Sequence, residues 1–169
     1  MKKITVLLAE DHTIVREGFR KMLEFEADFE VVGEAHDGRH AVALASKLRP
    51  EVVLMDIAMP LLNGLEATRR VLKALPATKV LILSAHNDDA YVETATAAGA
   101  AGFLLKQTTA HDVCRAIREV SDGRTFFTAS VSRRLGRLCH RVLLSHRRPA
   151  AAPPGGTAAG CPPAGGAGL

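Results

Sequence analysis

Three carboxylates follow two short apolar runs of this 169-residue chain, and they are the residues best placed to do chemistry. Glu10 and Asp11 come directly after the run 4–9, and Asp56 follows the Val-rich run 52–55. Short, continuous apolar runs indicate buried parallel strands, and the carboxyl ends of such strands lie at the ligand-binding edge of an open sheet. Mg²⁺ prefers carboxylate and other oxygen ligands. Glu10, Asp11 and Asp56 therefore predict a magnesium site at this edge.

Two further polar residues end apolar runs, and they make the predicted chemistry more specific. Ser84 ends the run 79–84, and Lys106 follows the run 102–105. A metal ion and a lysine neutralise the charge of a transferring phosphoryl group, and a hydroxyl can hydrogen-bond one of its oxygens. A single aspartate at a strand end is more often a turn or capping residue. Suitable groups at four strand ends instead predict phosphoryl transfer to Asp56.

The elements that must position these residues alternate regularly along the chain. The predicted strands are Ile4–Ala9, Phe29–Ala35, Val52–Met55, Lys79–Ser84 and Gly102–Leu105, and the predicted helices are Thr13–Phe25, Arg39–Leu48, Gly64–Leu75, Asp88–Ala98 and Ala110–Ser121. Five alternating pairs indicate an α/β fold with a doubly wound five-stranded parallel sheet. The flavodoxin-like order 2-1-3-4-5 is favoured because it places the first and third strands side by side, which brings their terminal acids together.

Two of the predicted helices carry further local signals. The first shows one apolar stripe at helical spacing, which includes Ile14, Phe19 and Leu23. The last follows Thr109, whose hydroxyl predicts an N-cap. Both helices are therefore expected to pack one face against the sheet.

The chain changes character after Gly123. Residues 1–122 carry a net charge of −3, whereas residues 123–169 contain seven arginines and no acid. Within residues 128–148, the segment Ser130–Leu144 has apolar residues at helical spacing and predicts a basic linker helix. Residues 149–169 include seven Ala, six Gly and five Pro, a composition that can bury almost nothing and predicts a disordered tail.

Cysteine usage and hydropathy suggest the compartment. Cys114, Cys139 and Cys161 are widely spaced, without metal-type pairing, which fits a reducing environment better than a disulfide framework. No apolar stretch approaches the length of a membrane span, and the short run after the N-terminal lysines is interpreted as a strand rather than a signal peptide. A cytoplasmic protein without membrane association is expected.

The acidic and basic motifs together resemble the receiver domain of two-component response regulators, specifically those of the NarL/FixJ (LuxR-type) subclass. The segments that carry the resemblance are Leu8–His12, Val53–Pro60, Leu81–Ala85, Gly99–Lys106 and Ala116–Val120 with Gly123. It covers about residues 3–127, so residues 1–127 are expected to form the receiver domain.

The resemblance implies a role for each residue of the predicted site. Asp56 would be the phosphoacceptor, and Asp11, Asp56 and the Ala58 carbonyl would bind Mg²⁺, with Glu10 acting mainly through metal-bound water. Lys106 would pair with the phosphoryl group.

A switch pair is implied as well. The Ser84 hydroxyl would move toward the phosphoryl group, and the Phe103 ring would follow inward. Two positions depart from the common pattern. Gln107 stands where many receivers have proline, and Phe103 lacks the hydroxyl of the more usual tyrosine. Neither departure removes the chemistry.

The resemblance also implies partners, namely a sensor histidine kinase and a second copy of the chain in a homodimer. The dimer face is left open between helix 88–98 with strand 102–105 and the pair of helices 13–25 and 110–121. Tyr91, in helix 88–98, needs no partner to explain it, and His12 and His86 are interpreted as solvated loop residues.

Regulators of this subclass usually continue into a DNA-binding helix-turn-helix domain. No stretch after Arg148 has the apolar periodicity of such a domain, and the composition there suggests a frameshift or truncation of a transcription regulator, although a stand-alone receiver is the alternative. The arginines could give weak, salt-dependent association with DNA, but no specific DNA binding is expected from this chain.

Two other function classes fit the sequence less well than signalling. An Mg²⁺-dependent phosphatase with Asp56 as nucleophile would carry a second acid two residues later, where this chain has Ala58. A flavin site would need a hydroxyl- and glycine-rich phosphate loop after the first strand, where Glu10 and Asp11 would repel phosphate. The chain is therefore expected to be a phosphorylated signalling protein and not an enzyme, with the phosphatase as the alternative.

Overall fold

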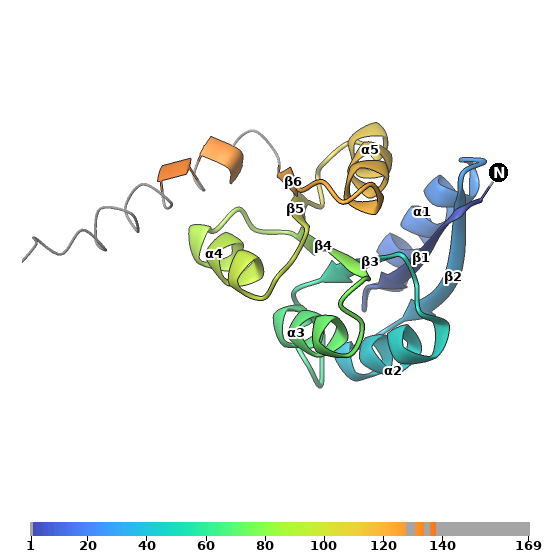
Figure 1. The fold of residues 1–169 in the computed structure, drawn as a ribbon, viewed down its shortest axis with the longest axis horizontal. Coiled ribbons are helices and arrows are strands. Elements are labelled where there is room, and N and C mark those ends of the chain that lie inside the picture. The colour runs from blue at the N-terminus through green and yellow to red at the C-terminus, as the bar shows by residue number, and fades with distance from the viewer. Residues whose placement is uncertain (1, 128–130, 134–135, 138–169) are drawn as a thin grey trace, which may run out of the picture.

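The computed structural model of the chain describes residues 2–127, 131–133 and 136–137. Six parallel strands form one sheet in the order β2-β1-β3-β4-β5-β6, with helices on both faces (Figure 1). The strands are β1 Ile4–Ala9, β2 Phe29–Ala35, β3 Val52–Asp56, β4 Lys79–Ser84, β5 Gly102–Leu105 and β6 Phe126–Phe127. The helices are α1 Thr13–Glu24, α2 Gly38–Leu48, α3 Gly64–Ala74, α4 Asp89–Ala97 and α5 Ala110–Ser121. The predicted fold class and the order of the first five strands are confirmed.

The predicted number of strands is wrong by one, because β6 extends the sheet beside β5. Phe126 pairs with Gly102, and Phe127 pairs with Phe103. A side chain at position 102 would place its Cβ only 2.3 Å from the Phe126 carbonyl oxygen, so glycine permits the close approach. Two residues cannot establish a period-two pattern, which explains why the sequence did not predict this strand.

Alternating side chains of the strands build two cores, one on each face of the sheet. Leu7, Val53, Ile82 and Phe103 belong to the core under α2, α3 and α4, whereas the neighbouring residues of the same strands face α1 and α5. These neighbours include Val6, Leu8, Leu54, Leu81 and Leu104. The sheet is therefore buried on both faces, as its continuous apolar strands predict.

The helices begin largely where their capping residues predict. The side chains of Asp37, Asn63, Asp88 and Thr109 accept backbone hydrogen bonds at the starts of α2, α3, α4 and α5. The expected N-cap at Thr109 is confirmed. The apolar stripe of α1 is narrower than predicted, because Leu23 is buried whereas Ile14 is 85 % exposed. Ile14 lies in the first turn of α1, one residue after the helix begins.

The chain after α5 returns to the sheet. Val131 is fully buried in the core that contains Phe103, and the Ser132 hydroxyl donates to the Phe127 carbonyl at 3.1 Å. Residues 131–133 and 136–137 are helical, but most of the predicted linker helix and the whole predicted tail 149–169 lie outside the described residues. No helix in the described part of the chain combines the length and apolar character needed to cross a membrane.

Candidate functional site

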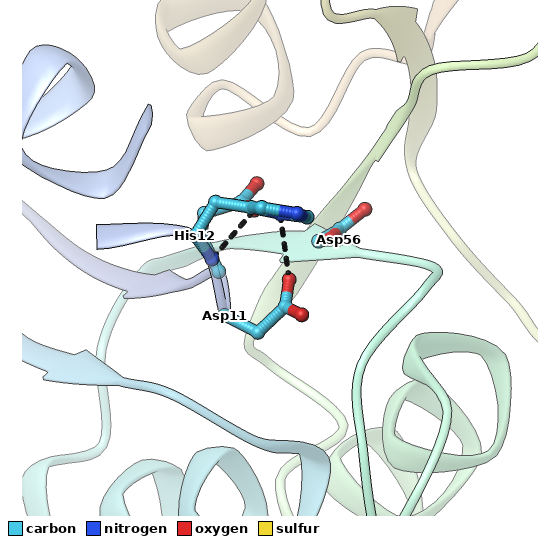
Figure 2. Close-up of side chains that lie close together, drawn as sticks. Asp11, His12 and Asp56 are labelled. Carbon is cyan, nitrogen blue, oxygen red and sulfur yellow. Dashed lines mark hydrogen bonds and ion pairs between the residues drawn. The ribbon is translucent and has the colours of Figure 1, made fainter. Parts of the chain in front are cut away.

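The predicted site residues come together at the carboxyl edge of the sheet. β1 and β3 are neighbours, with Ala9 opposite Met55, so Glu10 and Asp11 after β1 lie beside Asp56 at the end of β3. Figure 2 shows the side chains of Asp11 and Asp56 at the ends of these two strands, with His12 beside Asp11. Side-chain ligand atoms of Glu10, Asp11, His12 and Asp56 all lie within 4.8 Å of one another. The strand order thus assembles the acids that the sequence singled out.

Lys106 joins two of these acids. Its Nζ atom lies 2.8 Å from Glu10 Oε2 and 3.1 Å from Asp56 Oδ2. Its backbone N–H also donates to the Ser84 carbonyl, which ties the end of β5 to the end of β4. Burial lowers the pKa of Lys106, but its ion pairs with Glu10 and Asp56 outweigh burial and raise that pKa overall. Lys106 is therefore a fixed cation directed at the acid cluster.

The Asp56 carboxyl is in an environment that disfavours its charge. The residue is 1 % exposed. Burial, followed by the nearby charge of Glu10, raises the pKa of Asp56 to about 6, although Lys106 and the backbone N–H of Ala58 act in the opposite direction. One lysine is thus too little positive charge for two buried acids, and a bound cation would correct the deficit.

Three carboxylate oxygens of the cluster lack an aligned hydrogen-bond donor. They are Glu10 Oε2, Asp11 Oδ1 and Asp56 Oδ2. Lys106 Nζ and His12 Nδ1 lie close enough to form ion pairs with them, so their charge is partly balanced while their lone pairs remain poorly satisfied. Buried oxygens left in this state are costly unless a cation binds them. The donor set consists mainly of hard oxygens and therefore fits Mg²⁺.

His12 lies in the exposed loop between β1 and α1, as interpreted from the sequence, and it also contacts the acid cluster. Its Nδ1 atom lies 2.9 Å from Glu10 Oε1 and 3.0 Å from Asp11 Oδ1, although 65 % of the side chain is exposed (Figure 2). The hydrogen bond to Glu10, followed by the charge of Asp11, raises the pKa of His12. The signal for this role was its position directly after the two acids.

The two predicted switch residues lie in different surroundings. The Ser84 hydroxyl donates to the His86 carbonyl at 2.7 Å and accepts from the His86 backbone N–H at 3.0 Å, so it is held by the loop between β4 and α4. The Phe103 ring is fully buried in the core with Val92 of α4. The ring is therefore already inside the molecule while the hydroxyl is bound to the loop.

The loop between β3 and α3 also holds Asp56 in place. Leu62 N–H donates to the Pro60 carbonyl across Leu61, whose φ of 66° marks a tight, strained turn. The backbone N–H of Ala58 lies 3.4 Å from Asp56 Oδ1. A Cβ on Gly64 would lie 1.8 Å from the Asp56 carbonyl oxygen, so α3 begins in direct contact with the backbone of Asp56.

The sequence of the chain is similar to those of known signalling proteins. Residues 6–118 match the family described as the response regulator receiver domain. The transcriptional regulatory protein DegU of Brevibacillus brevis is 41 % identical over 146 residues, which cover 86 % of this chain and 59 % of DegU. The response regulator protein VraR of Staphylococcus aureus is 41 % identical over 128 residues, covering 76 % of this chain and 61 % of VraR. The chain thus spans about six tenths of the length of these relatives.

Solved structures agree with the sequence matches. A LuxR-family two-component response regulator from Aurantimonas sp. SI85-9A1 superimposes with a TM-score of 0.77 at 31 % identity, covering 83 % of this chain and 99 % of that one. The signal receiver domain of the putative response regulator NarL from Mycobacterium tuberculosis gives 0.70 at 36 % identity, covering 73 % and 100 %. The isolated REC domain of RcsB from Salmonella enterica serovar Typhimurium, solved with the phosphomimetic BeF3-, gives 0.72 at 29 % identity, covering 79 % and 99 %.

Proposed function

The chain belongs to the response regulator receiver domain family of two-component systems, and on that premise we propose that Asp56 accepts a phosphoryl group from a sensor histidine kinase in a Mg²⁺-dependent reaction. The observation that carries the proposal is the contact of Lys106 with both Glu10 and Asp56 beside three poorly satisfied carboxylate oxygens. Lysine, acids and phosphoacceptor then form one phosphoryl-transfer site.

The reaction requires an ionised Asp56 and a neutralised phosphoryl group. An Asp56 carboxylate oxygen attacks phosphorus, and the bond from phosphorus to the kinase imidazole breaks, with the electron pair returning to the imidazole nitrogen. Lys106 offers its positive charge to the phosphoryl oxygens, and the Ala58 N–H donates to Asp56 Oδ1 at 3.4 Å. Asp11, Asp56 and the Ala58 carbonyl would hold Mg²⁺ directly, and Glu10 would act through metal-bound water. The ion would supply the remaining positive charge.

The conformational response follows from the hydrogen bonds of Ser84. If its hydroxyl turns to a phosphoryl oxygen, it gives up the His86 carbonyl and releases the loop before α4. Phe103 of β5 and Val92 of α4 belong to the same core, so the rearranged loop shifts the packing of α4 and β5. Phosphorylation thus favours one of two packings of this face, which is a population shift.

The wider role is signal transduction in the cytoplasm, with a sensor histidine kinase as donor and a homodimer as the assembled form. Relatives carry names of transcriptional regulators, and one RcsB structure is described as two RcsB dimers bound to two parallel DNAs. Transcription regulation is accordingly proposed for the full regulator, whereas this chain by itself is expected not to bind DNA specifically. An Mg²⁺-dependent phosphatase acting on outside substrates is disfavoured by Ala58, which supplies no second acid.

The direct test is intact-mass measurement after exposure to a small phosphodonor, with and without Mg²⁺. The wild-type chain should gain one phosphoryl group only with Mg²⁺, and Asp56→Asn should gain none. Asp122→Asn is the matched control, because Asp122 is an exposed acid at the end of α5, remote from the site. An equal adduct on Asp56→Asn would disprove the assignment.

A further inference from the structure

Two histidines at the start of α2 hold their rings in contact. His36 follows β2 and His40 lies in the first turn of α2, and their Nδ1 atoms are 3.2 Å apart. The ring centroids are 4.7 Å apart and the ring planes meet at 53°, so the contact joins two nitrogens rather than two ring faces. Two potential ligand atoms from one short segment are thus brought to a single point.

That separation suits a shared metal ion. Zinc binds imidazole nitrogen at about 2.0–2.1 Å with tetrahedral geometry, which separates two ligand nitrogens by about 3.3 Å. We propose that His36 and His40 form a site for a borderline divalent transition-metal ion such as Zn²⁺, ligated by both Nδ1 atoms. Water would complete the coordination at this solvent-exposed position.

Asp37 supports both histidines. Its Oδ1 atom accepts the His40 backbone N–H at 2.7 Å, which caps α2, and its Oδ2 atom lies 3.3 Å from His36 Nε2. A carboxylate beside the remote nitrogen of an imidazole keeps the proton there and leaves the other nitrogen free to bind metal. Asp37 is buried, so this orientation is fixed by the fold.

The backbone that carries the two histidines is held firmly in place. A Cβ on Gly38 would lie 1.9 Å from the Leu62 carbonyl oxygen, so the start of α2 is pressed against the loop before α3. The Ala41 N–H also donates to the Asp37 carbonyl at 3.0 Å. A site whose ligands are already positioned loses less entropy on binding than one assembled from mobile side chains.

Two effects oppose metal binding, and they limit its strength. Without metal, His40 Nδ1–H can donate to His36 Nδ1, and this hydrogen bond must be given up. The helix N-terminus also disfavours a cation, although the Asp37 carboxylate offsets that field. Mg²⁺ does not compete here, because it prefers oxygen ligands, whereas imidazole suits zinc, copper and nickel. The site should therefore distinguish Zn²⁺ from the Mg²⁺ of the acid cluster.

The test is Zn²⁺ titration of the full chain by calorimetry, in a non-chelating buffer with excess Mg²⁺ to occupy the acid cluster. Cys139→Ser and Cys161→Ser are introduced in every sample, because free thiols bind zinc. His36→Asn and His40→Asn should each lower Zn²⁺ affinity by at least about tenfold. Loss of a group that only supports a ligand already costs about that much, and these variants remove a ligand itself. NMR signals of the two imidazoles should shift on zinc addition, which calorimetry alone would not reveal.

Matched controls separate this site from others. His111→Asn removes an exposed histidine of α5, and His12→Asn removes the histidine of the acid cluster. Both variants should keep the Zn²⁺ binding step that His36→Asn and His40→Asn weaken. Asp37→Asn should weaken binding while keeping the helix cap, because asparagine caps as well as aspartate. Equal affinity in His36→Asn, or its loss in His12→Asn, would overturn the proposal. Neither result depends on phosphoryl transfer at Asp56.

Discussion

The phosphoacceptor itself limits the stability of the metal-free protein. Burial and Glu10 raise the pKa of Asp56 to about 6, above the value of about 3.9 for an unfolded aspartate. The folded state therefore binds this proton more tightly, and the resulting stabilisation is present below about pH 4 and lost as pH rises through about 6. A charged Asp56 at neutral pH thus weakens the fold.

Asp56→Asn should therefore increase the free energy of unfolding at pH 7.5 in the absence of divalent ions, by an amount on the order of 2 kcal/mol. Urea unfolding monitored by circular dichroism at pH 7.5 and pH 5 would measure the difference. The advantage of the variant should shrink at the lower pH, where the wild-type carboxyl is largely protonated. A pH-independent difference between the two proteins would contradict this account of Asp56.

At the scale of elements, the junction between β3 and α3 has no room for a side chain. The Cβ of Gly64→Ala would meet the Asp56 carbonyl oxygen at 1.8 Å, so the backbone that carries the phosphoacceptor must move. We expect a loss of roughly 2 kcal/mol or more in the free energy of unfolding, in line with overpacked sites. Urea unfolding together with the phosphodonor assay would detect both consequences.

Gly18→Ala is the matched control for that substitution. Gly18 lies within α1, and nothing stands within 4 Å of an added Cβ. Alanine is favoured over glycine in a helix interior by roughly 0.5–1 kcal/mol, so this variant should be more stable than wild type. Equal destabilisation by the two substitutions would show that crowding against Asp56 is not the cause.

A second contact between elements joins α5 to the loop before β2. Arg118 donates from Nε and Nη2 to both oxygens of Asp28, contacts Glu26, and lies 4.9 Å from the centroid of the Phe29 ring. The hydrogen bond from Arg118 lowers the pKa of Asp28. The associated stability is present above the unfolded pKa of about 3.9 and is lost as pH falls below it.

Arg118→Lys should accordingly destabilise the protein by about 1 kcal/mol at pH 7, because lysine cannot reproduce the two-pronged contact or the ring contact. The expected loss of stability is small because the side chains of Arg118 and Asp28 are both partly exposed to water. Thermal unfolding at pH 7 and pH 3 would measure it, and the difference should be smaller at pH 3, where unfolded Asp28 is largely protonated. Arg124→Lys, at an exposed pair with Asp122, should have no comparable effect.

The elements also show what local sequence can and cannot predict. β1, β2, β4 and β5 have the predicted bounds. β1, β4 and β5 are largely apolar runs closed by polar or turn residues, whereas β2 is interrupted by Glu30, Gly33 and Glu34. β6 was not predicted, since its two residues are ordered by pairing with Gly102, which is distant in sequence. The contacts of His12 with Glu10 and Asp11 were not predicted either, because they depend on how the end of β1 is arranged in space.

At the scale of the whole molecule, Val131 links the segment after α5 to the core that contains the switch residue Phe103. It is fully buried in the same core as Phe103. Val131→Ala removes two methyl groups from that core and should cost roughly 1–3 kcal/mol in the free energy of unfolding. Arg137→Ala, an exposed position further along, is the control and should change little. Urea unfolding would distinguish them, and an unchanged Val131→Ala would place this residue outside the cooperative fold.

Phosphorylation of Asp56 should promote self-association of the chain. A phosphoryl group at Asp56 can alter self-association only through surfaces that differ between the two packings of the molecule. We expect the groove between α1 and α5 to be the contact, because it is lined mainly by apolar side chains and its wall at Thr108 lies two residues beyond Lys106. Sedimentation velocity with and without beryllofluoride should show more dimer with the mimic.

Charged substitutions decide between the two faces. Val15→Arg in the α1–α5 groove should abolish the response, whereas Tyr91→Arg on α4 should preserve it. The opposite pattern would assign the dimer to the face of α4 and β5. A chain ending at Arg148 should respond like the full chain, because Leu169 is the only large apolar side chain in residues 149–169 and the others can bury little surface. A response lost on that truncation would instead make the tail part of the assembly.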